Sequence, residues 1–376
     1  TDDLKFTTKS GTNIDLYTGT LTSSGNNITF DGAVRVLSSN DSTISTGSGA
    51  GNIIFNSTIN GSSANSGTLT LNSGTGNIDF NGAIGNSTSF ESLTITNSAL
   101  TNFNSTVNIG TNLTQTNAAT GITTFTNTVN VGGAATLRGT IFNINNSWSS
   151  TGATSFTNSG LITKSATGAI TANGGFSTTG DINLSSNIST TNTNLSIGGN
   201  LTIAEAKNLT LSTSTGAGNI SVSGQTQGTT GGANETLTLL AGTGNITFSD
   251  LVGRKESDEL AQVTITSGAT TTFANRVDLT GILTQTAGSV ATTFSGVVDV
   301  GTLTLTGTAF NFNNSVNTTN AITITNSGLV TKNNVGNILS GGAFSTSGAL
   351  TLGSDLTTTN GAITVGGALT LSDPSD

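Results

Sequence analysis

Two aspartates of this 376-residue chain have the spacing that a carboxylate site would need. Asp278 and Asp299 are 21 residues apart, about one turn of a stacked β-structure, which would place their carboxylates on adjacent turns. Paired carboxylates can act as general acid and base or bind Ca²⁺ weakly. The corresponding positions earlier in the chain are Asn108 and Asn130. This difference between the repeats is most simply explained by drift between Asn and Asp at an outward position. The sequence therefore favours drift over a catalytic or calcium-binding role for the two aspartates.

The composition removes most of the residue types on which enzymes depend. The chain has no His, Cys or Met, which excludes Ser-His and Cys-His catalysis and the usual zinc ligands. We therefore predict no enzyme, no catalytic residue and no cofactor, with Asp278 and Asp299 as weak candidates for a metal site. The 10 Lys plus Arg, against 19 Asp plus Glu, form no basic cluster for nucleic acid. The chain contains no run of about 18 apolar residues, so we predict that it does not insert into a membrane.

A seven-residue motif occurs twice and defines a long period of about 168 residues. Residues 74–80 read Gly-Thr-Gly-Asn-Ile-Asp-Phe, and residues 242–248 read Gly-Thr-Gly-Asn-Ile-Thr-Phe. The glycines and the Asn suit a tight corner, and the apolar-polar-apolar ending predicts a short strand with one buried face. The motif therefore predicts a chain built from turns and short strands.

Matching positions continue along the chain at this long period, with small slips that indicate insertions in loops. The period divides the chain into the end of a preceding repeat at 1–27, one repeat at 28–194, a second at 195–362, and the start of a further one at 363–376. We expect these parts to form one continuous solenoid. Because the chain opens and closes inside a repeat and begins at Thr1, we also expect it to be part of a longer protein.

A shorter period lies inside the long one. Apolar residues that begin similar patterns recur at spacings of 25, 23, 22 and 19, at Phe55, Phe80, Phe103, Phe125 and Ile144. A spacing near 20 fits one turn of a β-solenoid, whereas a propeller blade needs about 40 residues. Thr and Asn, which are frequent here, are poor helix formers. We therefore predict an all-β fold, a right-handed parallel β-helix with stacked inward residues and hydrogen-bonded corner asparagines. Trp148 aligns with Val316 and is predicted to lie in the core.

Two kinds of triplet suggest further roles. Thr-x-Thr triplets suggest an ice-binding solenoid as a minor alternative, for example at 94–96, 264–266 and 302–304. Against this role, the middle residue would have to point inward, and the triplets do not recur at one fixed coil length. Asn-x-Ser/Thr triplets would be glycan acceptors in a glycosylating cell, although chance explains many of them in this composition. They include those at Asn56, Asn86, Asn104, Asn112, Asn187, Asn245 and Asn313.

The repeat style resembles a known class of protein. The motif at 242–248, followed by Leu-Val-Gly at 251–253, Val-Thr-Ile at 263–265 and Thr-Thr-Phe at 271–273, is similar to the β-strand repeats of bacterial surface exoproteins of the filamentous-haemagglutinin and autotransporter-adhesin type. The resemblance implies a parallel β-helix exported to the cell surface for adhesion, biofilm matrix or filament formation. We therefore expect an extracellular stalk or self-assembling filament segment, with head-to-tail self-association or cell-surface and matrix partners. The alternative is a β-helix that binds or cleaves carbohydrate.

Overall fold

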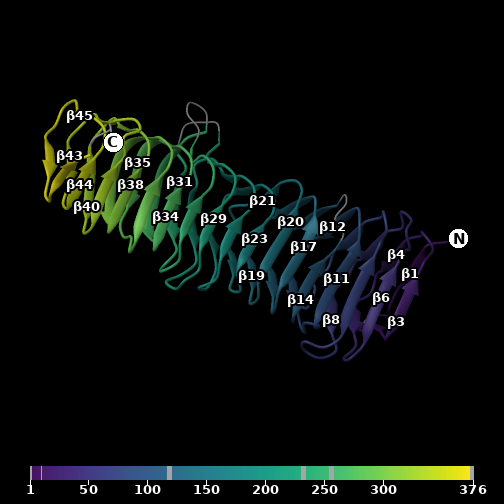
Figure 1. The fold of residues 1–376 in the computed structure, drawn as a ribbon. Coiled ribbons are helices and arrows are strands. Elements are labelled where there is room, and N and C mark those ends of the chain that lie inside the picture. Colours follow the sequence, from purple (N-terminus) through teal and green to yellow (C-terminus); the bar gives the residue numbers. More distant parts are fainter. Residues whose placement is uncertain (1, 10, 117–120, 230–233, 254–257, 373–376) are drawn as a thin grey trace. The chain divides into compact units, whose positions relative to one another are not determined.

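The computed structural model describes residues 2–9, 11–116, 121–229, 234–253 and 258–372. These residues form strands and turns and no helix, so none of them supplies a long apolar helix that could cross a membrane. The strands run parallel and stack as a β-solenoid of about 17 turns with about 21 residues in each (Figure 1). The all-β parallel β-helix predicted from the sequence is confirmed. The chain divides into two compact units, Thr1–Ile182 and Asn183–Asp376, whereas the repeat boundaries at 27, 194 and 362 stay a prediction.

The turns of the first unit build three parallel sheets, in which each strand pairs with the equivalent strand of the next turn. The first sheet contains β1 (Leu4–Phe6), β4 (Ile28–Phe30), β7 (Ile53–Phe55), β10 (Ile78–Phe80), β12 (Leu100–Phe103), β15 (Ile122–Phe125), β18 (Ile141–Ile144) and β21 (Ile162–Lys164). The second contains β2 (Ile14–Leu16), β5 (Val34–Val36) and β8 (Ile59–Gly61), continued through a bridge at Ile84 by β13 (Val107–Ile109), β16 (Val129–Val131), β19 (Trp148–Ser150) and β22 (Ile170–Ala172). The third contains β3 (Gly19–Thr22), β6 (Asp41–Ser45), β9 (Thr68–Asn72), β11 (Ser92–Asn97), β14 (Asn112–Gln115), β17 (Ala135–Gly139), β20 (Thr154–Asn158) and β23 (Phe176–Thr178).

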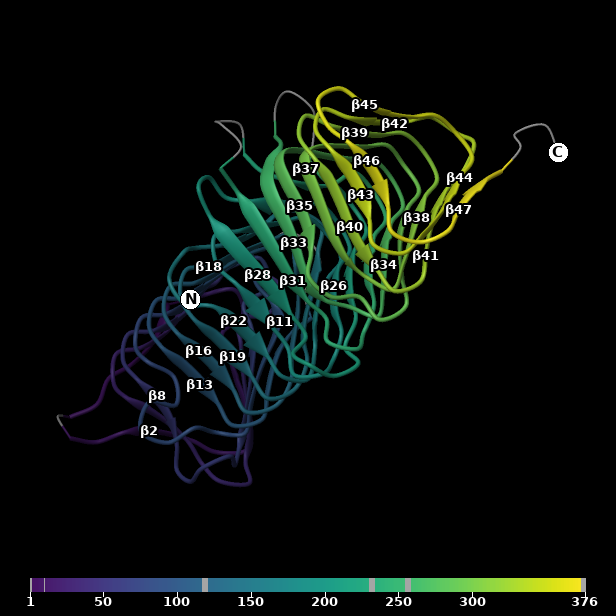
Figure 2. The same cartoon turned by 90° about the vertical axis from the view of Figure 1, so that its left-hand side faces the viewer.

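The second unit follows the same plan, and β24 (Ile182–Leu184) connects the chain to it. One column of strands contains β26 (Leu195–Ile197), β29 (Ile220–Val222), β32 (Ile246–Phe248), β34 (Thr270–Phe273), β36 (Ala291–Phe294), β38 (Ala309–Phe312), β41 (Leu329–Lys332), β44 (Ala349–Leu352) and β47 (Leu369–Leu371). A second contains β28 (Asn208–Ser212), β31 (Thr236–Leu240), β33 (Leu260–Ser267), β35 (Val277–Gln285), β37 (Val298–Gly307), β40 (Ile322–Asn326), β43 (Phe344–Thr346) and β46 (Ile363–Val365). The remaining strands are β25 (Ile188–Ser189), β27 (Leu201–Ile203), β30 (Thr226–Gln227), β39 (Val316–Thr318), β42 (Ile338–Ser340) and β45 (Leu356–Thr358). Figure 2 shows the last turns of this unit, with β42 and β45, β43 and β46, and β44 and β47 on three different sides.

Alternation along each short strand sends one set of side chains into the solenoid. In β10, Ile78 and Phe80 are buried while Asp79 between them is partly exposed. Pairing then sets each inward residue on its equivalent in the next turn. The five positions that the short period predicted are register partners on successive strands: Phe55, Phe80, Phe103, Phe125 and Ile144. The predicted stacked core is therefore confirmed within this unit.

The inward phenylalanines form ladders of parallel rings. In the first unit the ladder runs from Phe6 to Phe125, with ring centroids of neighbours 4.6 to 5.3 Å apart. In the second unit it runs from Phe248 to Phe312 at 5.1 to 5.3 Å. Phe80 and Phe248, the last residues of the two copies of the motif, are both buried and each stacks on the phenylalanine of the next turn. Phe80 also stacks on Phe55 of the preceding turn, where Phe248 instead pairs with Val222. Trp148 is buried as predicted, and its Nε1 donates to Thr154 Oγ1 at 2.9 Å.

Corner asparagines are hydrogen-bonded from turn to turn, as predicted. The backbone N–H of Asn77 donates to Asn52 Oδ1 at 2.8 Å, and the N–H of Asn52 donates to Asn27 Oδ1 at 2.8 Å. The second unit repeats this contact between Asn245 and Asn219 at 2.8 Å. Each amide oxygen therefore satisfies a backbone donor at a corner, where the strand ladder is interrupted.

The second glycine of the motif is needed for close stacking of the turns. A Cβ atom added at Gly76 would overlap the carbonyl oxygen of Gly51 in the neighbouring turn, and one at Gly244 would overlap that of Gly218. We expect Gly76→Ala to lower the free energy of unfolding by about 1–3 kcal/mol, because backbone must shift to admit the methyl group. Urea denaturation measures this loss. Thr75→Ala, at the exposed residue before it, is the control, and equal stability of the two variants would contradict the steric explanation.

Candidate functional site

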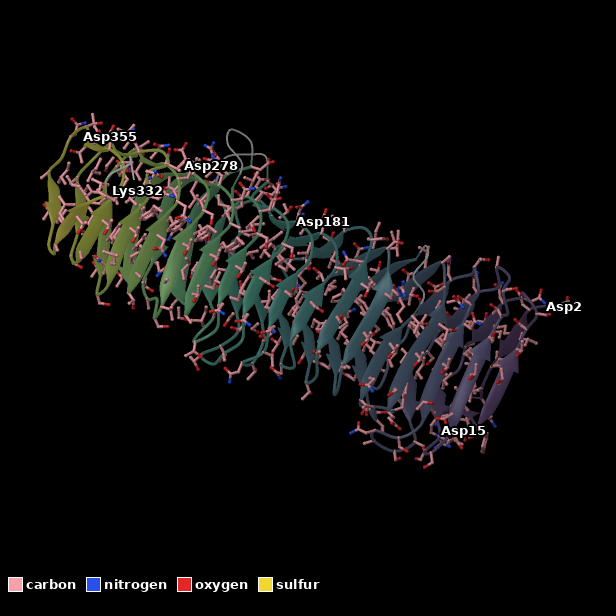
Figure 3. The ribbon with its side chains drawn as sticks, in the orientation of Figure 1. Asp2, Asp15, Asp181, Asp278, Lys332 and Asp355 are labelled. Carbon is pink, nitrogen blue, oxygen red and sulfur yellow. The ribbon has the colours of Figure 1, made fainter. Side chains whose placement is uncertain are left out.

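The structure places the two candidate aspartates side by side on the second unit. Asp278 on β35 and Asp299 on β37 are register partners, as expected for adjacent turns. Arg276 lies with them, and its Nη2 is 3.0 Å from Asp278 Oδ2 and 3.0 Å from Asp299 Oδ2. The side chain of Asp278 is 7% exposed, whereas those of Asp299 and Arg276 are about one-third exposed. The three residues form a charged cluster, and Figure 3 labels Asp278 among the side chains of the second unit.

The guanidinium of Arg276 is a cation already placed between the two carboxylates. Ca²⁺ in proteins takes six to eight oxygen ligands, and the ranges that the structure describes contain no group of three or more His, Cys, Asp or Glu side chains suited to a metal. In this structure both carboxylates form an ion pair with the same guanidinium. A metal site at Asp278 and Asp299 stays a prediction.

The first unit has an uncharged version of the same cluster. Asn108 and Asn130 are register partners on β13 and β16, and Asn130 Nδ2 donates to Asn108 Oδ1 at 2.7 Å. The residue that corresponds to Arg276 is Thr106. Side chains thus bond along the turns in both versions, once through amides and once through an ion pair.

This correspondence gives a matched test of the cluster. We expect Arg276→Thr to lower the free energy of unfolding by about 2 kcal/mol, because it removes the cation from two neighbouring carboxylates, one of them nearly buried. The triple variant Arg276→Thr, Asp278→Asn, Asp299→Asn reproduces the first unit's residues and should recover most of the loss. Urea denaturation measures both. A triple variant as unstable as the single one would show that charge pairing is not what stabilises this position.

Beside the amide pair, the first unit has a shallow groove of about 340 Å³. It is lined by uncharged residues: Asn65, Ser89, Asn108, Ile109, Gly110, Asn130, Val131, Gly132, Ser149 and Thr151. Gly110 and Gly132 leave backbone exposed in it, and Ser89 Oγ donates to Asn65 Oδ1 at 2.9 Å. The groove offers amide and hydroxyl groups, which suit a neutral polar ligand.

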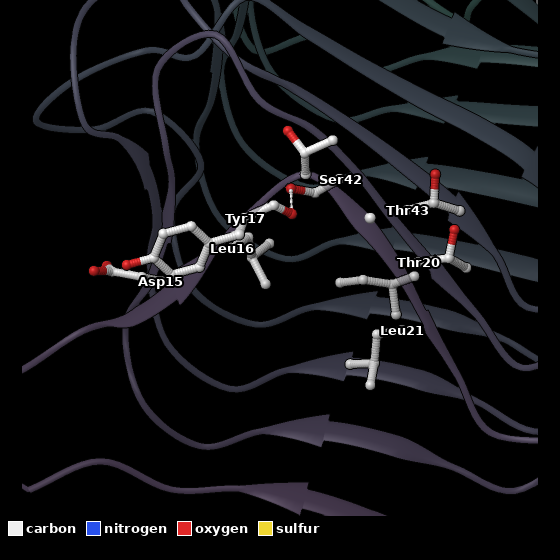
Figure 4. Close-up of a pocket in the computed structure, with 10 residues that line it drawn as sticks. Asp15, Leu16, Tyr17, Thr20, Leu21, Ser42 and Thr43 are labelled. Atoms are coloured by element: carbon white, nitrogen blue, oxygen red, sulfur yellow. Dashed lines mark hydrogen bonds between the residues drawn. The ribbon is translucent and has the colours of Figure 1, made fainter.

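A second groove, of about 270 Å³, lies on the early turns of the first unit (Figure 4). Tyr17 lines it and is 68% exposed, and Ser42 Oγ donates to the Tyr17 carbonyl at 2.9 Å. Asp15 also lines it, and Arg35 donates to both Asp15 oxygens at 2.8 and 2.7 Å. These hydrogen bonds hold the pKa of Asp15 below its ordinary value. The carboxylate is therefore bound within the protein.

Two buried lysines were not found by the sequence reasoning. Lys164 and Lys332 each follow the aromatic and aliphatic residues of an inward column and are fully buried. Lys164 Nζ donates to the carbonyls of Ser165 at 2.9 Å and Thr167 at 2.8 Å. Burial lowers the pKa of Lys164 to about 8 and also lowers the pKa of Lys332. Their recurrence at the period of the long repeat was the signal that could have revealed them.

Buried amides recur at equivalent positions in the same way. Asn158 Nδ2 donates to the Gly160 carbonyl at 2.6 Å, and its Oδ1 accepts from the Gly180 N–H at 3.0 Å. Asn326 makes the same two contacts with Gly328 at 2.7 Å and Gly348 at 2.9 Å. These side chains satisfy backbone groups at the corners and so have a structural role.

The predicted glycan acceptors take part in similar bonds. Asn56 Nδ2 donates to Asp31 Oδ1 at 2.7 Å, and Asn104 Nδ2 donates to Asn81 Oδ1 at 2.8 Å. The nitrogen that would carry a glycan is thus bonded to a neighbouring turn in both. The polar side chains of this surface thus largely bind one another.

No protein-family model, curated protein or solved structure matches the chain.

Proposed function

We propose that this chain is a segment of an extracellular structural or adhesive protein, in which the stacked turns serve as a stiff stalk or filament segment. The observation that carries the proposal is the pairing of like residues on successive turns within each unit. In the first unit, six phenylalanines on successive turns stack ring on ring, at Phe6, Phe30, Phe55, Phe80, Phe103 and Phe125. The turns are therefore hydrogen-bonded to their neighbours along several sheets.

This construction supports a mechanical role. Parallel turns lie about 4.8 Å apart, and bending or stretching a unit must disturb hydrogen bonds and ring stacking in several sheets at once. The stability of such a stack is a sum over neighbouring turns rather than the property of one globular core. The stack can then lengthen without loss of stability per turn, which is what a spacer requires.

The adhesive part of the proposal rests on the resemblance to filamentous-haemagglutinin-type and autotransporter adhesins and on the outer surface. Outward strand positions carry mainly Thr, Ser and Asn, and the groove beside Asn108 and Asn130 is uncharged. The proposed partners are cell-surface or matrix components, or further copies of the chain. The groove also favours the alternative, a carbohydrate-binding β-helix, with neutral sugar hydroxyls bound by its amides.

Pulling single molecules by their two ends tests the structural role. We expect force peaks separated by the length of one or several turns, which is about 70 Å of extended chain for each turn of about 21 residues. A chain that extends smoothly at low force, as a disordered polymer does, would contradict a load-bearing role.

Beads coated with the chain test the adhesive role. We expect them to bind cells, matrix or each other more than beads coated with an unrelated protein of similar charge. A glycan array distinguishes the alternative: binding to neutral glycans that Asn108→Ala and Asn130→Ala abolish would favour the carbohydrate-binding function. Beads that bind nothing would overturn the adhesive role and leave the stalk to be judged by the pulling experiment.

A further inference from the structure

A column of threonines runs along one sheet of the second unit. Successive strands place a threonine or serine at the same outward position, each the register partner of the next: Thr210, Thr238, Thr264, Thr284, Thr304, Thr323 and Ser345. In its middle four turns the column is doubled, because a second threonine follows two residues later, within the strand in three turns and directly after β35 in the fourth. We call the resulting four-by-two array the threonine face: Thr264, Thr266, Thr284, Thr286, Thr304, Thr306, Thr323 and Thr325.

The two features that counted against this role in the sequence are consistent with it in the structure. The middle residue of each triplet does point inward, and this is what turns both threonines outward. Ile265, Gln285, Leu305 and Ile324 are all at most 2% exposed. The unequal coil lengths do not break the register, since Thr264, Thr284, Thr304 and Thr323 pair directly although the last spacing is 19 residues rather than 20.

The threonine face is regular in both directions. Neighbouring strands are about 4.8 Å apart, and residues two positions apart on a strand are about 6.6 Å apart. Figure 2 shows its strands β33, β35, β37 and β40 side by side. The residues two positions before the first threonine of each turn are also uncharged: Gln262, Ile282, Thr302 and Ala321. Among the described residues, the hydroxyls of Thr284, Thr304 and Thr323 make no hydrogen bond with the protein, and are open to water.

Preference of strands for threonine explains one outward column but not the doubled array. The other long column of this unit also places threonine outward, at Thr247, Thr272 and Thr293, but Asn311 follows and no second threonine column runs beside it. The corresponding array of the first unit is interrupted, because Arg138 stands in the position of Thr306 and Ser155 in that of Thr323.

A periodic array of one side chain matches a partner that is itself periodic. The surface of an ordinary protein has no repeated pattern that would match the threonine face. An ice surface does, because its hydrogen-bonded water molecules repeat at fixed spacings. Each threonine carries a methyl group and a hydroxyl that can both donate and accept. Two of these hydroxyls are bonded within the protein: that of Thr264 accepts from Gln262, and that of Thr286 donates to the Thr266 carbonyl. Its branched side chain is restricted at χ1 and stands on a rigid sheet, so little conformational freedom is lost on binding. We propose that the threonine face binds ice.

Ice affinity of the purified chain tests this proposal. A fluorescently labelled chain is frozen slowly into polycrystalline ice, and the fraction retained in the ice is compared with that of an inert protein of similar size. We expect retention and faceted growth of single ice crystals. We expect Thr304→Arg to lose both retention and faceting. This change introduces at the centre of the face the residue type found at Arg138, and the long charged side chain prevents close contact between the face and the ice lattice.

Thr272→Arg is the matched control, since it places the same charge at an outward threonine of a different strand column and should retain ice affinity. Circular dichroism and urea denaturation of both variants establish that they fold. Exclusion of the parent chain from ice would overturn the proposal, and so would equal retention of the two variants. Binding to powdered crystalline chitin or cellulose, lost in Thr304→Arg while the parent chain is excluded from ice, would assign the face to a crystalline polysaccharide instead.

Discussion

Replacing Phe103 by alanine should lower the free energy of unfolding by about 3–5 kcal/mol. Phe103 is 1% exposed, and its ring lies 4.7 Å from that of Phe80 and 4.6 Å from that of Phe125. The substitution removes a ring from the middle of the ladder and loses both stacking contacts. The turns are held at the strand spacing by hydrogen bonds, so the cavity cannot collapse and most of the cost of an unfilled space remains.

Urea denaturation followed by circular dichroism measures this loss. Thr126→Ala, at the exposed residue after Phe125, is the control and should change stability by less than about 0.5 kcal/mol. Phe273→Ala makes the same test in the second unit, where the neighbouring rings are 5.3 and 5.1 Å away. If Phe103→Ala lost no more than Thr126→Ala, the ring ladder would not be a main source of stability.

The ladder itself was predictable because its signal is local. Alternation within a strand and a spacing near 20 between strands can both be read from the sequence, and they placed Phe80 above Phe55 and below Phe103 correctly. Corner asparagines were predictable for the same reason, since Gly-Asn before an alternating triplet marks a turn that begins a strand. The repeat boundaries are a different matter, because periodicity fixes the length of a repeat and not where it begins.

The candidate site was predictable only in part. The spacing of Asp278 and Asp299 placed them on adjacent turns, as the strand pairing confirms. Arg276 was missed, although residues two positions apart in an extended segment face the same side and Arg276 precedes Asp278 by two. A pair of carboxylates suggests a metal site, but a guanidinium of the same chain can also serve as their cation.

The buried lysines were missed because a charged residue ordinarily indicates solvent exposure. Lys164 and Lys332 are exceptions, since the corner that follows each one turns carbonyls toward the ammonium group. Ser165 and Thr167 supply these carbonyls to Lys164, and neither residue type signals such an arrangement. Only the return of lysine at the equivalent place of the next repeat distinguishes the position from an ordinary surface lysine.

These lysines should make stability depend on pH in a defined direction. Burial lowers the pKa of Lys164 from 10.5 to about 8, so the folded state binds the proton less tightly than the unfolded state does. The energetic penalty of holding the charged form is fully present below pH 8. It is relieved as the pH rises from about 8 to 10.5, because the folded state releases its proton first. Stability from this source therefore increases with pH in that window.

Comparison with Lys164→Met isolates this contribution, because methionine fills similar space without titrating. We expect the free energy of unfolding of the parent chain, minus that of the variant, to rise by about 1–3 kcal/mol between pH 7 and 10. Urea denaturation across this range measures the difference, and Lys332→Met should change in the same direction. Phe103→Ala is the control, because it lowers stability without removing a titrating group and its difference from the parent should not vary with pH. A difference for Lys164→Met that stays flat or falls would mean that the carbonyls of Ser165 and Thr167 stabilise the ammonium more than burial penalises it.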